Sequence, residues 1–217
     1  MTNTYPLIVI FSWLSLIIFT SFLCRKFFPE ERELSRKIVH IGTGPIIPLA
    51  WWFNISINVA LPLALLVTIA LIGNQRAKII PSFENIERKS FGTIAYGVSI
   101  SLLITLFWSK TPSAVTAGVL VMSFGDGLAG LIGRKVKSPS WVLLGQKKSL
   151  MGTLVMGITT TIVLLTLNQI TNLQLGSVDI LSLTTLAVIL EQISPLGIDN
   201  ITVPMGVGIT WHWMLFN

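Results

Sequence analysis

Long apolar runs separated by short polar segments make up most of the chain. A helix needs about 20 apolar residues to cross the hydrocarbon of a bilayer. Residues 5–23 meet this requirement without a charged side chain. Further apolar runs cover residues 38–53, 57–73, 91–108, 114–133, 149–167, 178–193 and 201–216. The pattern predicts an all-α integral membrane protein, a bundle of seven to eight transmembrane helices.

Two of these runs are less regular than the others. The run at 38–53 is short and contains Pro45 and Pro48, so we expect a kink there. The run at 178–193 is the weakest, because Asp179 and Glu191 bracket its apolar core. Seven and eight spans are therefore both compatible with the sequence. We find no repeat and no soluble domain, and we expect a single polytopic membrane domain over residues 1–217.

Composition supports the membrane class. Of the 217 residues, 52% are hydrophobic and only 11% are charged, whereas soluble domains carry about 25% charged residues. The single cysteine, Cys24, excludes an internal disulfide framework and a cysteine-based metal cluster. No basic residue precedes the first apolar run, and Arg25 and Lys26 follow it. This is the reverse of a secretory signal peptide, so we expect the first run to be retained.

The distribution of cations predicts the orientation in the membrane. Eight spans place residues 24–37, 74–90, 134–148 and 194–200 on one side. Of the 15 lysines and arginines, only Lys110 lies on the other side. The positive-inside rule makes the cation-rich side cytoplasmic and both termini external. The net charge of +6 then reflects topology and attraction to anionic lipid, and we expect no nucleic-acid partner.

One carboxylate, Asp126, lies within an apolar run. A charge in a membrane helix costs roughly 2.5–3.5 kcal/mol on insertion scales, so it is usually paired or functional. Asp126 precedes Arg134 by eight residues, which places it about 12 Å below the cytoplasmic end of the helix. A helix face of small residues explains close helix packing but not the charge. We interpret Asp126 as part of a polar cavity, where Gly127 and Gly130 would let a phosphate or metal approach the backbone.

A basic segment follows this carboxylate. Arg134, Lys147 and Lys148 lie at two membrane edges joined by a short loop, and Lys147, Lys148 and Ser149 are predicted to open a helix. Helix N-termini with lysines and hydroxyls bind oxyanions well. The alternative is that the lysines only anchor the helices at the cytoplasmic surface. The segment is not a P-loop, because a Gln-Lys pair stands where Gly-Lys is required.

Further polar residues are predicted on the same side of the membrane. Lys37 and His40 share a helix face, and His40 is either an interfacial hydrogen-bonder or a base that titrates near neutral pH. The other candidates are Glu87, Arg88, Lys89, Glu191 and Asp199. Each has an alternative interpretation as a solvated charge or a helix cap. Their convergence on one side of the membrane favours a common site.

Several stretches together resemble the polyprenol kinase family, which includes phytol kinases, dolichol kinases and CTP-dependent diacylglycerol kinases. The matching stretches are Arg36–His40, Glu87–Thr93, Gly125–Arg134, Lys147–Thr153, and Glu191 with Gly197–Asn200 and Val203-Pro204. They follow the family order from about residue 30 to 205. Chain length and the Arg-Lys-Ser-Phe-Gly-Thr stretch are most similar to the phytol kinases of cyanobacteria and plastids.

The resemblance implies phosphoryl transfer from CTP, or a similar nucleotide, to a long-chain isoprenoid alcohol such as phytol, with Mg²⁺. Asp126 would hold the metal, with Asp199 and Glu87 as further ligands. The proton of the alcohol would pass to Asp199, Glu191 or His40. The remaining candidates would hold the nucleotide phosphates: Arg134, Lys147, Lys148, Ser149, Lys37, Arg88, Lys89, Gly127 and Gly130.

Three alternatives remain open at this point. The chain also resembles phosphatidate cytidylyltransferases, but those often carry a glutamate where Met151 stands. A CTP-dependent diacylglycerol kinase would share the motifs and differ in its acceptor. An ion-coupled transporter would also explain a buried Asp126. However, transporter sites lie near the bilayer midplane between repeats, whereas these polar groups lie at one edge.

Overall fold

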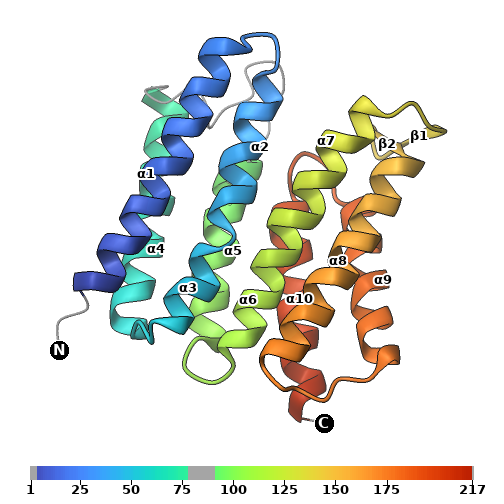
Figure 1. Cartoon of the computed structure of the whole chain (residues 1–217). Helices are drawn as coiled ribbons and strands as arrows, with labels where there is room; N and C mark the ends of the chain where they lie inside the picture. The colour runs from blue at the N-terminus through green and yellow to red at the C-terminus, as the bar shows by residue number, and fades with distance from the viewer. Residues whose placement is uncertain (1–3, 78–90, 217) are drawn as a thin grey trace.

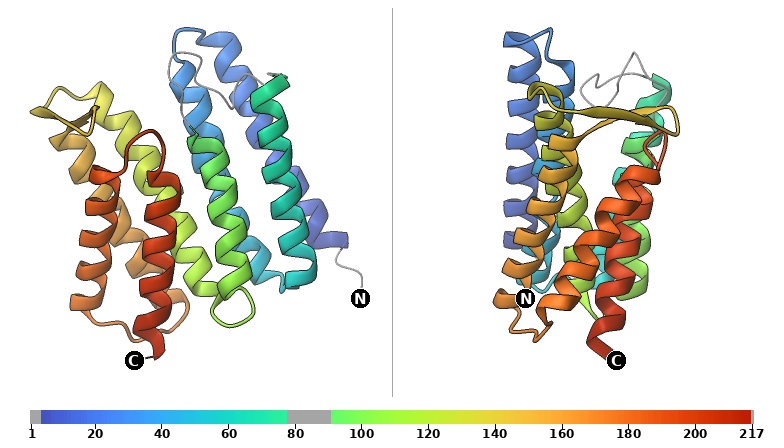
Figure 2. Two further views of the ribbon diagram at one scale, coloured as in Figure 1. Left: turned by 180° about the vertical axis from the view of Figure 1, so that it is seen from behind. Right: turned by 90° about the vertical axis from the view of Figure 1, so that its right-hand side faces the viewer.

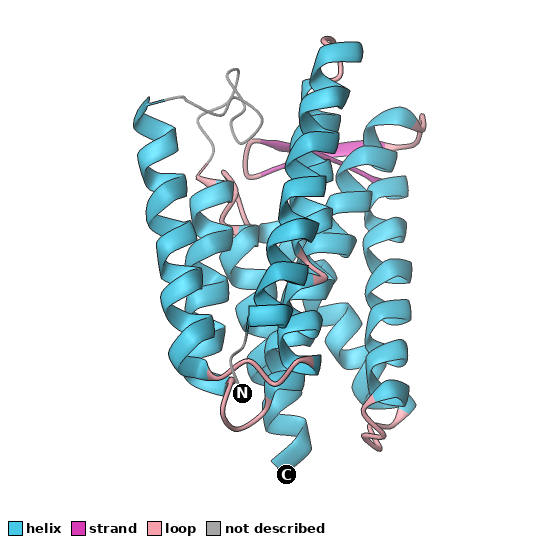
Figure 3. Cartoon of the chain, turned by 60° about the vertical axis from the view of Figure 1, so that its left-hand side comes forward, coloured by secondary structure: helices cyan, strands magenta, loops and turns pink. Residues whose placement is uncertain are grey.

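Helices joined by short loops account for nearly all of the structure. The computed structural model describes residues 4–77 and 91–216. The helices are α1 (Thr4–Phe27), α2 (Arg32–Thr43), α3 (Ile46–Trp52), α4 (Ile57–Ala77), α5 (Gly92–Phe107), α6 (Pro112–Leu120), the π-helical segment η2 (Val121–Asp126), α7 (Gly127–Lys135), α8 (Leu150–Ile170), α9 (Ser177–Ile193) and α10 (Asp199–Phe216). Strands β1 (Ser140–Leu143) and β2 (Gln146–Ser149) form an antiparallel hairpin (Figure 3). The predicted helical class is confirmed, and the hairpin is an addition to it.

The helices run back and forth along one axis and form two layers (Figures 1 and 2). One layer contains α1, α2–α3, α6–α7 and α8, and the other contains α4, α5, α10 and α9. Both termini lie at the same end of the bundle. The opposite end carries loop 28–31, the β1–β2 hairpin and loop 194–198, and is called the hairpin end below. Alternating direction therefore brings segments that are distant in sequence to one end.

Within residues 4–77 and 91–216, four helical segments are long and apolar enough to cross a membrane: Thr4–Phe27, Ile57–Gln75, Pro112–Lys135 and Leu150–Ile170. Their outward faces expose large apolar side chains, among them Phe11 of α1, Ile69 of α4 and Ile162 of α8. A surface of this kind suits lipid and would be unusual in contact with water. The membrane class follows from these segments, and the full number of seven to eight crossings stays a prediction.

Two interruptions in the helices have identifiable causes. The expected kink in the run at 38–53 is present, because α2 ends at Thr43 and α3 begins at Ile46. Pro45, between them, has no N–H to continue the helix, and its ring would clash with the carbonyl group of Ile41. The second interruption is η2, whose wider turns shift the register just before Asp126. A regular helix was expected there.

The core is built around α6, which is buried along its length. Ala114, Val115, Ala117 and Val119 are fully buried. α6 packs against α10 at a point where a Cβ atom on Gly118 would overlap the carbonyl oxygen of Pro204. Small residues thus bring the helix backbones close together, which is the usual basis of helix association in membranes.

Candidate active site

Lys37 of α2 and Asp126 of η2 form a buried ion pair at the hairpin end. Nζ of Lys37 lies 2.5 Å from Oδ2 of Asp126 and 3.1 Å from its backbone carbonyl oxygen. Nε2 of His40 lies 3.4 Å from the same carboxylate oxygen and 3.3 Å from the carbonyl oxygen of Met122. The charge of Asp126 is therefore balanced by a cation from another helix, a partner that the sequence analysis did not identify.

Helix periodicity and two glycines create this pair. Lys37 and His40 are three residues apart, so both side chains project from one face of α2 toward η2 and α7. A Cβ atom on Gly127 would overlap the side chain of Ile41, and one on Gly130 would lie 3.0 Å from Cε of Lys37. The space beside both glycines is thus filled by side chains of α2. A direct role of Gly127 and Gly130 in phosphate binding stays a prediction.

A second buried ion pair joins the hairpin to α9. Nζ of Lys148 lies 2.5 Å from Oε1 of Glu191 and donates to the backbone carbonyl of Glu191 at 2.7 Å. Gln192 donates to the other oxygen of Glu191 at 2.8 Å and to Oγ1 of Thr153 at 2.9 Å. Glu191 is therefore held on both oxygens, and these bonds fix Lys148 near the start of α8.

Asp199, the first residue of α10, is buried without an ion pair to any described residue. Its Oδ1 accepts hydrogen bonds from the backbone N–H and the side-chain amide of Asn200, both at 3.0 Å. Asp126, Lys148, Lys37 and Glu191 all lie close enough to act on it electrostatically. Asp199 thus lies within electrostatic reach of both ion pairs, and we treat these charges as one cluster.

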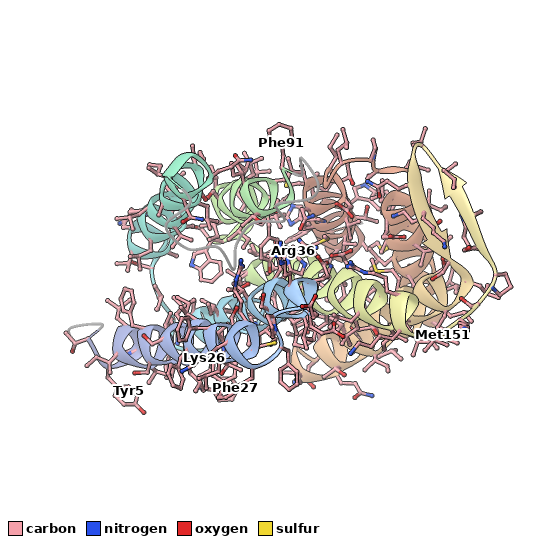
Figure 4. The ribbon with its side chains drawn as sticks, turned by 90° about the horizontal axis from the view of Figure 1, so that it is seen from above. Tyr5, Lys26, Phe27, Arg36, Phe91 and Met151 are labelled. Carbon is pink, nitrogen blue, oxygen red and sulfur yellow. The ribbon has the colours of Figure 1, made fainter. Side chains whose placement is uncertain are left out.

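Glu33 and Arg36 form the outer edge of this cluster. Arg36 donates to Glu33 through Nε at 3.1 Å, and Arg134 also contacts Glu33. Burial raises the pKa of Glu33, but the hydrogen bond from Arg36 and the charges of Arg36 and Arg134 outweigh burial and lower the pKa overall. Arg36 also acts electrostatically on Asp126 and Asp199. Seen from the hairpin end, Arg36 lies near the middle of the bundle, while Tyr5 and Phe27 lie at its rim (Figure 4).

The remaining predicted residues differ in how they relate to the cluster. Ser149 caps α8, since its Oγ accepts from the backbone N–H of Gly152 at 3.2 Å and donates to the carbonyl of Gly133 at 3.1 Å. Lys147 and Lys148 do not open the helix as predicted, because they belong to β2. Strand alternation buries Lys148 and exposes Lys147. Glu87, Arg88 and Lys89 lie outside the described residues.

The carboxylates fit a magnesium ion that would arrive with phosphates. No group of three His, Cys, Asp or Glu side chains forms a ready metal site within residues 4–77 and 91–216. However, Oδ1 of Asp126 and Oδ2 of Asp199 have no hydrogen-bond partner among these residues. Mg²⁺ keeps several waters and usually takes one or two carboxylates plus substrate phosphates. Asp126 and Asp199 supply this donor set, and Glu87, the third predicted ligand, is not described.

An apolar cavity adjoins the charged cluster. Its volume is about 210 Å³, and it lies between α1, α2, α4 and α5. Its wall consists of Leu14, Ile17, Ile18, Arg36, Val39, His40, Thr43, Val67, Leu71, Gly92, Thr93, Tyr96, Gly97, Ile100 and Asn200. Arg36 and His40 therefore belong both to the cavity wall and to the charged cluster. An apolar ligand in this cavity would bring its polar end to the cluster.

The bundle combines buried carboxylates, a histidine and cations at one end with an adjoining apolar cavity. This arrangement fits a membrane enzyme that acts on a lipid and a charged co-substrate. Sequence comparison agrees with this class. The chain is 35% identical to the phytol kinase of Synechocystis sp. over 209 residues, which cover 92% of this chain and 88% of the relative. The chain belongs to the phytol kinase family. No protein-family model and no solved structure matches it.

Family membership confirms the predicted polyprenol kinase family and the prediction that the chain is a kinase acting on a lipid alcohol. It favours this class over the cytidylyltransferase and transporter alternatives.

Sequence patterns did not predict the pairing of Lys37 with Asp126 or the position of Tyr96 in the cavity wall. The position of Lys37 near the site could have been predicted, because Lys37 shares a helix face with His40. No sequence pattern pointed to Tyr96, because a tyrosine in an apolar run usually packs against neighbouring helices.

Proposed function

We propose that the chain transfers the terminal phosphoryl group of CTP to phytol, or to a closely related long-chain isoprenoid alcohol, at the cytoplasmic surface of a membrane. One observation carries the proposal: Arg36 and His40 belong at once to the charged cluster and to the wall of the apolar cavity. A kinase for lipid alcohols needs this junction, because phosphate and alkyl chain require opposite surroundings.

The cations of the cluster would bind the nucleotide. Lys148 and Lys37 each use hydrogen bonds to a carboxylate and a carbonyl, and an ammonium group has a third N–H to donate. Arg36 and Arg134 share Glu33, and each guanidinium has five N–H groups, more than it uses on Glu33. Phosphoryl transfer depends chiefly on positioning and charge neutralisation, which buried cations supply.

We assign the proton of the alcohol to His40, because its ring lies in the cavity wall beside Asp126. Nε2 faces two acceptors, the carbonyl of Met122 and the carboxylate of Asp126, so the neutral ring carries its proton on Nε2. Nδ1 then keeps a free lone pair. The alcohol oxygen would form a bond to the γ-phosphorus while its proton passes to Nδ1. The bond from this phosphorus to the β–γ bridging oxygen would break, and its electron pair would leave with CDP.

Magnesium bound with CTP would neutralise charge on the phosphates, with Asp126 and Asp199 holding it. The positive-inside rule supports a cytoplasmic position for this end, because the topology predicted from the sequence assigns fourteen of the 15 lysines and arginines to that side. An alcohol dissolved in the bilayer and a nucleotide dissolved in the cytoplasm would meet at this depth. CDP would then be released on the cytoplasmic side, where the nucleotide entered.

The test uses purified protein in nanodiscs with separate panels of donors and acceptors. Donors are CTP, ATP, GTP and UTP; acceptors are phytol, geranylgeraniol, farnesol, dolichol and diacylglycerol. We expect the highest kcat/KM with CTP and phytol, and release of CDP. Release of pyrophosphate would identify a cytidylyltransferase, and preference for diacylglycerol would overturn the assignment of the acceptor.

A further inference from the structure

We propose that Tyr96, together with His40, binds the hydroxyl group of the isoprenoid alcohol, which enters the cavity sideways from the bilayer between α1 and α4. This inference rests on the proposed function and adds to it a site, an entry route and a binding residue. The carrying observation is a buried phenol in the wall of an apolar cavity, without a hydrogen bond of standard geometry to any residue that the structure describes.

Tyr96 has an unused hydrogen-bonding group at the right place. Its Oη is buried and makes no hydrogen bond of standard geometry to any described residue, although the hydroxyls of Thr43 and Ser123 lie within hydrogen-bonding reach of it. Thr43 and Ser123 use their protons on backbone carbonyls of His40 and Val119. Buried polar groups in native proteins almost always have a partner. A ligand hydroxyl would supply the partner that Tyr96 lacks.

The position of Tyr96 connects this group to the charged cluster. The centroid of its ring lies 4.6 Å from that of His40, and both rings line the cavity. Nε2 of His40 lies 3.4 Å from Asp126. A hydroxyl bound between the two rings would therefore lie beside the residues that we assign to the metal and the phosphates. Tyr96 would donate to the alcohol oxygen, and His40 would accept its proton.

The other end of the cavity faces lipid. Ile18 of α1 and Val67 of α4 both line the cavity and are partly exposed on the apolar surface of the bundle. α1 packs on α2 and α3, and α4 packs on α5, but α1 and α4 scarcely touch each other. Figure 4, which looks down the bundle axis, shows α1–α2 and α4–α5 in separate rows. A flexible branched tail can therefore extend through this side into the bilayer.

Two substitutions test the site. Tyr96→Phe keeps the ring and removes the hydroxyl, so we expect at least a tenfold rise in KM for phytol with KM for CTP unchanged. Thermal stability should be unchanged or higher, because no intramolecular hydrogen bond is lost. Leu71→Trp fills the cavity from α4 and should also raise KM for phytol. Ile69→Trp, at an exposed position of α4 outside the cavity wall, is the matched control and should behave as wild type.

A readout independent of turnover separates this inference from the proposed function. A phytol analogue with a diazirine in its tail should cross-link to peptides of α1, α4 or α5, and Leu71→Trp should abolish the cross-link while Ile69→Trp retains it. If wild type phosphorylates phytol but both cavity variants keep wild-type KM and cross-linking, the site is wrong and the function stands. If wild type cross-links phytol but never phosphorylates it, the proposed function fails and the site stands.

Discussion

Lys37 and Asp126, 89 residues apart in sequence, meet in a buried ion pair that joins α2 to η2 at a distance of 2.5 Å. The pair explains how an apolar segment tolerates a carboxylate. It also changes what a substitution at Asp126 will do, because removal of the carboxylate leaves a buried lysine without its partner. Removing one partner of a buried ion pair lowers the free energy of unfolding by about 3–5 kcal/mol. Replacing both partners by uncharged residues of similar volume often leaves the stability unchanged.

The first prediction separates the structural role of Asp126 from its chemical role. Asp126→Asn should lower the thermal stability in detergent and abolish phosphoryl transfer. The double variant Lys37→Met with Asp126→Asn should recover stability, because no buried charge remains unpaired, and should stay inactive. Melting temperature and CDP release are measured on the same preparations. A double variant that regains wild-type turnover would show that the pair only holds the helices together.

Asp199 offers a cleaner test of the metal site, because it has no ion pair among the described residues. Asp199→Asn retains an oxygen that can accept from Asn200, so folding should be preserved. A neutral amide oxygen binds Mg²⁺ poorly, so activity should fall by about 100-fold or more. Raising the Mg²⁺ concentration should recover part of the loss.

The matched control for this variant is Asp179→Asn. Asp179 lies in the first turn of α9, at the opposite end of the bundle, and accepts from the backbone N–H of Gly176 at 2.8 Å. Its substitution should weaken the helix cap slightly and leave the Mg²⁺ dependence unchanged. Equal Mg²⁺ profiles for Asp199→Asn and wild type would remove Asp199 from the metal site.

Adjacent lysines of the hairpin test the nucleotide site. Lys148 is buried in the cluster, whereas Lys147 is exposed on the other side of β2. A charge-assisted hydrogen bond contributes about 1.5–3 kcal/mol, so Lys148→Ala should raise KM for CTP by about 10- to 150-fold. Lys147→Ala should leave it unchanged. The measurement is steady-state kinetics with CTP varied at saturating phytol. Equal KM values for CTP in both variants would contradict a role of Lys148 in nucleotide binding.

The predicted orientation can be tested by labelling cysteines. Lys110 and Lys137 are both exposed, Lys110 in the loop before α6 and Lys137 between α7 and β1. In a background with Cys24→Ser, a cysteine at 137 should react with a membrane-impermeant maleimide only from the cytoplasmic side, and one at 110 only from outside. Labelling of both positions from the same side would refute the topology, because α6, η2 and α7 separate them.

Sequence patterns predicted the helical class and the positions of most helices, because most apolar runs are long and polar segments separate them. The kink near Pro45 followed from the chemistry of proline. The β1–β2 hairpin was missed, since residues 140–149 have no alternation of apolar and polar positions. η2 was missed because a single extra residue in a helical turn leaves no periodic signal over so short a segment.

The sequence predicted that several of the candidate residues lie close together but not how they pair, and their roles stay predictions. Asp126, His40, Lys148, Glu191 and Asp199 all meet at the hairpin end, as the topology implies. Which cation balances which carboxylate depends on the rotation of each helix, and hydrophobic helices such as α5 and α8 are apolar on all sides. Tertiary packing sets these rotations, so sequence periodicity could not predict the Lys37–Asp126 pair or the cavity beside Tyr96.

The most direct test of the central claim follows the γ-phosphate itself. Purified protein in nanodiscs is given phytol and CTP labelled either in the γ-phosphate or in the cytosine ring, and the lipid phase is analysed. We expect γ-label in phytyl phosphate, one CDP formed per labelled lipid, and no cytosine label in the lipid. Cytosine label in the lipid, or γ-label that never leaves the aqueous phase, would contradict it.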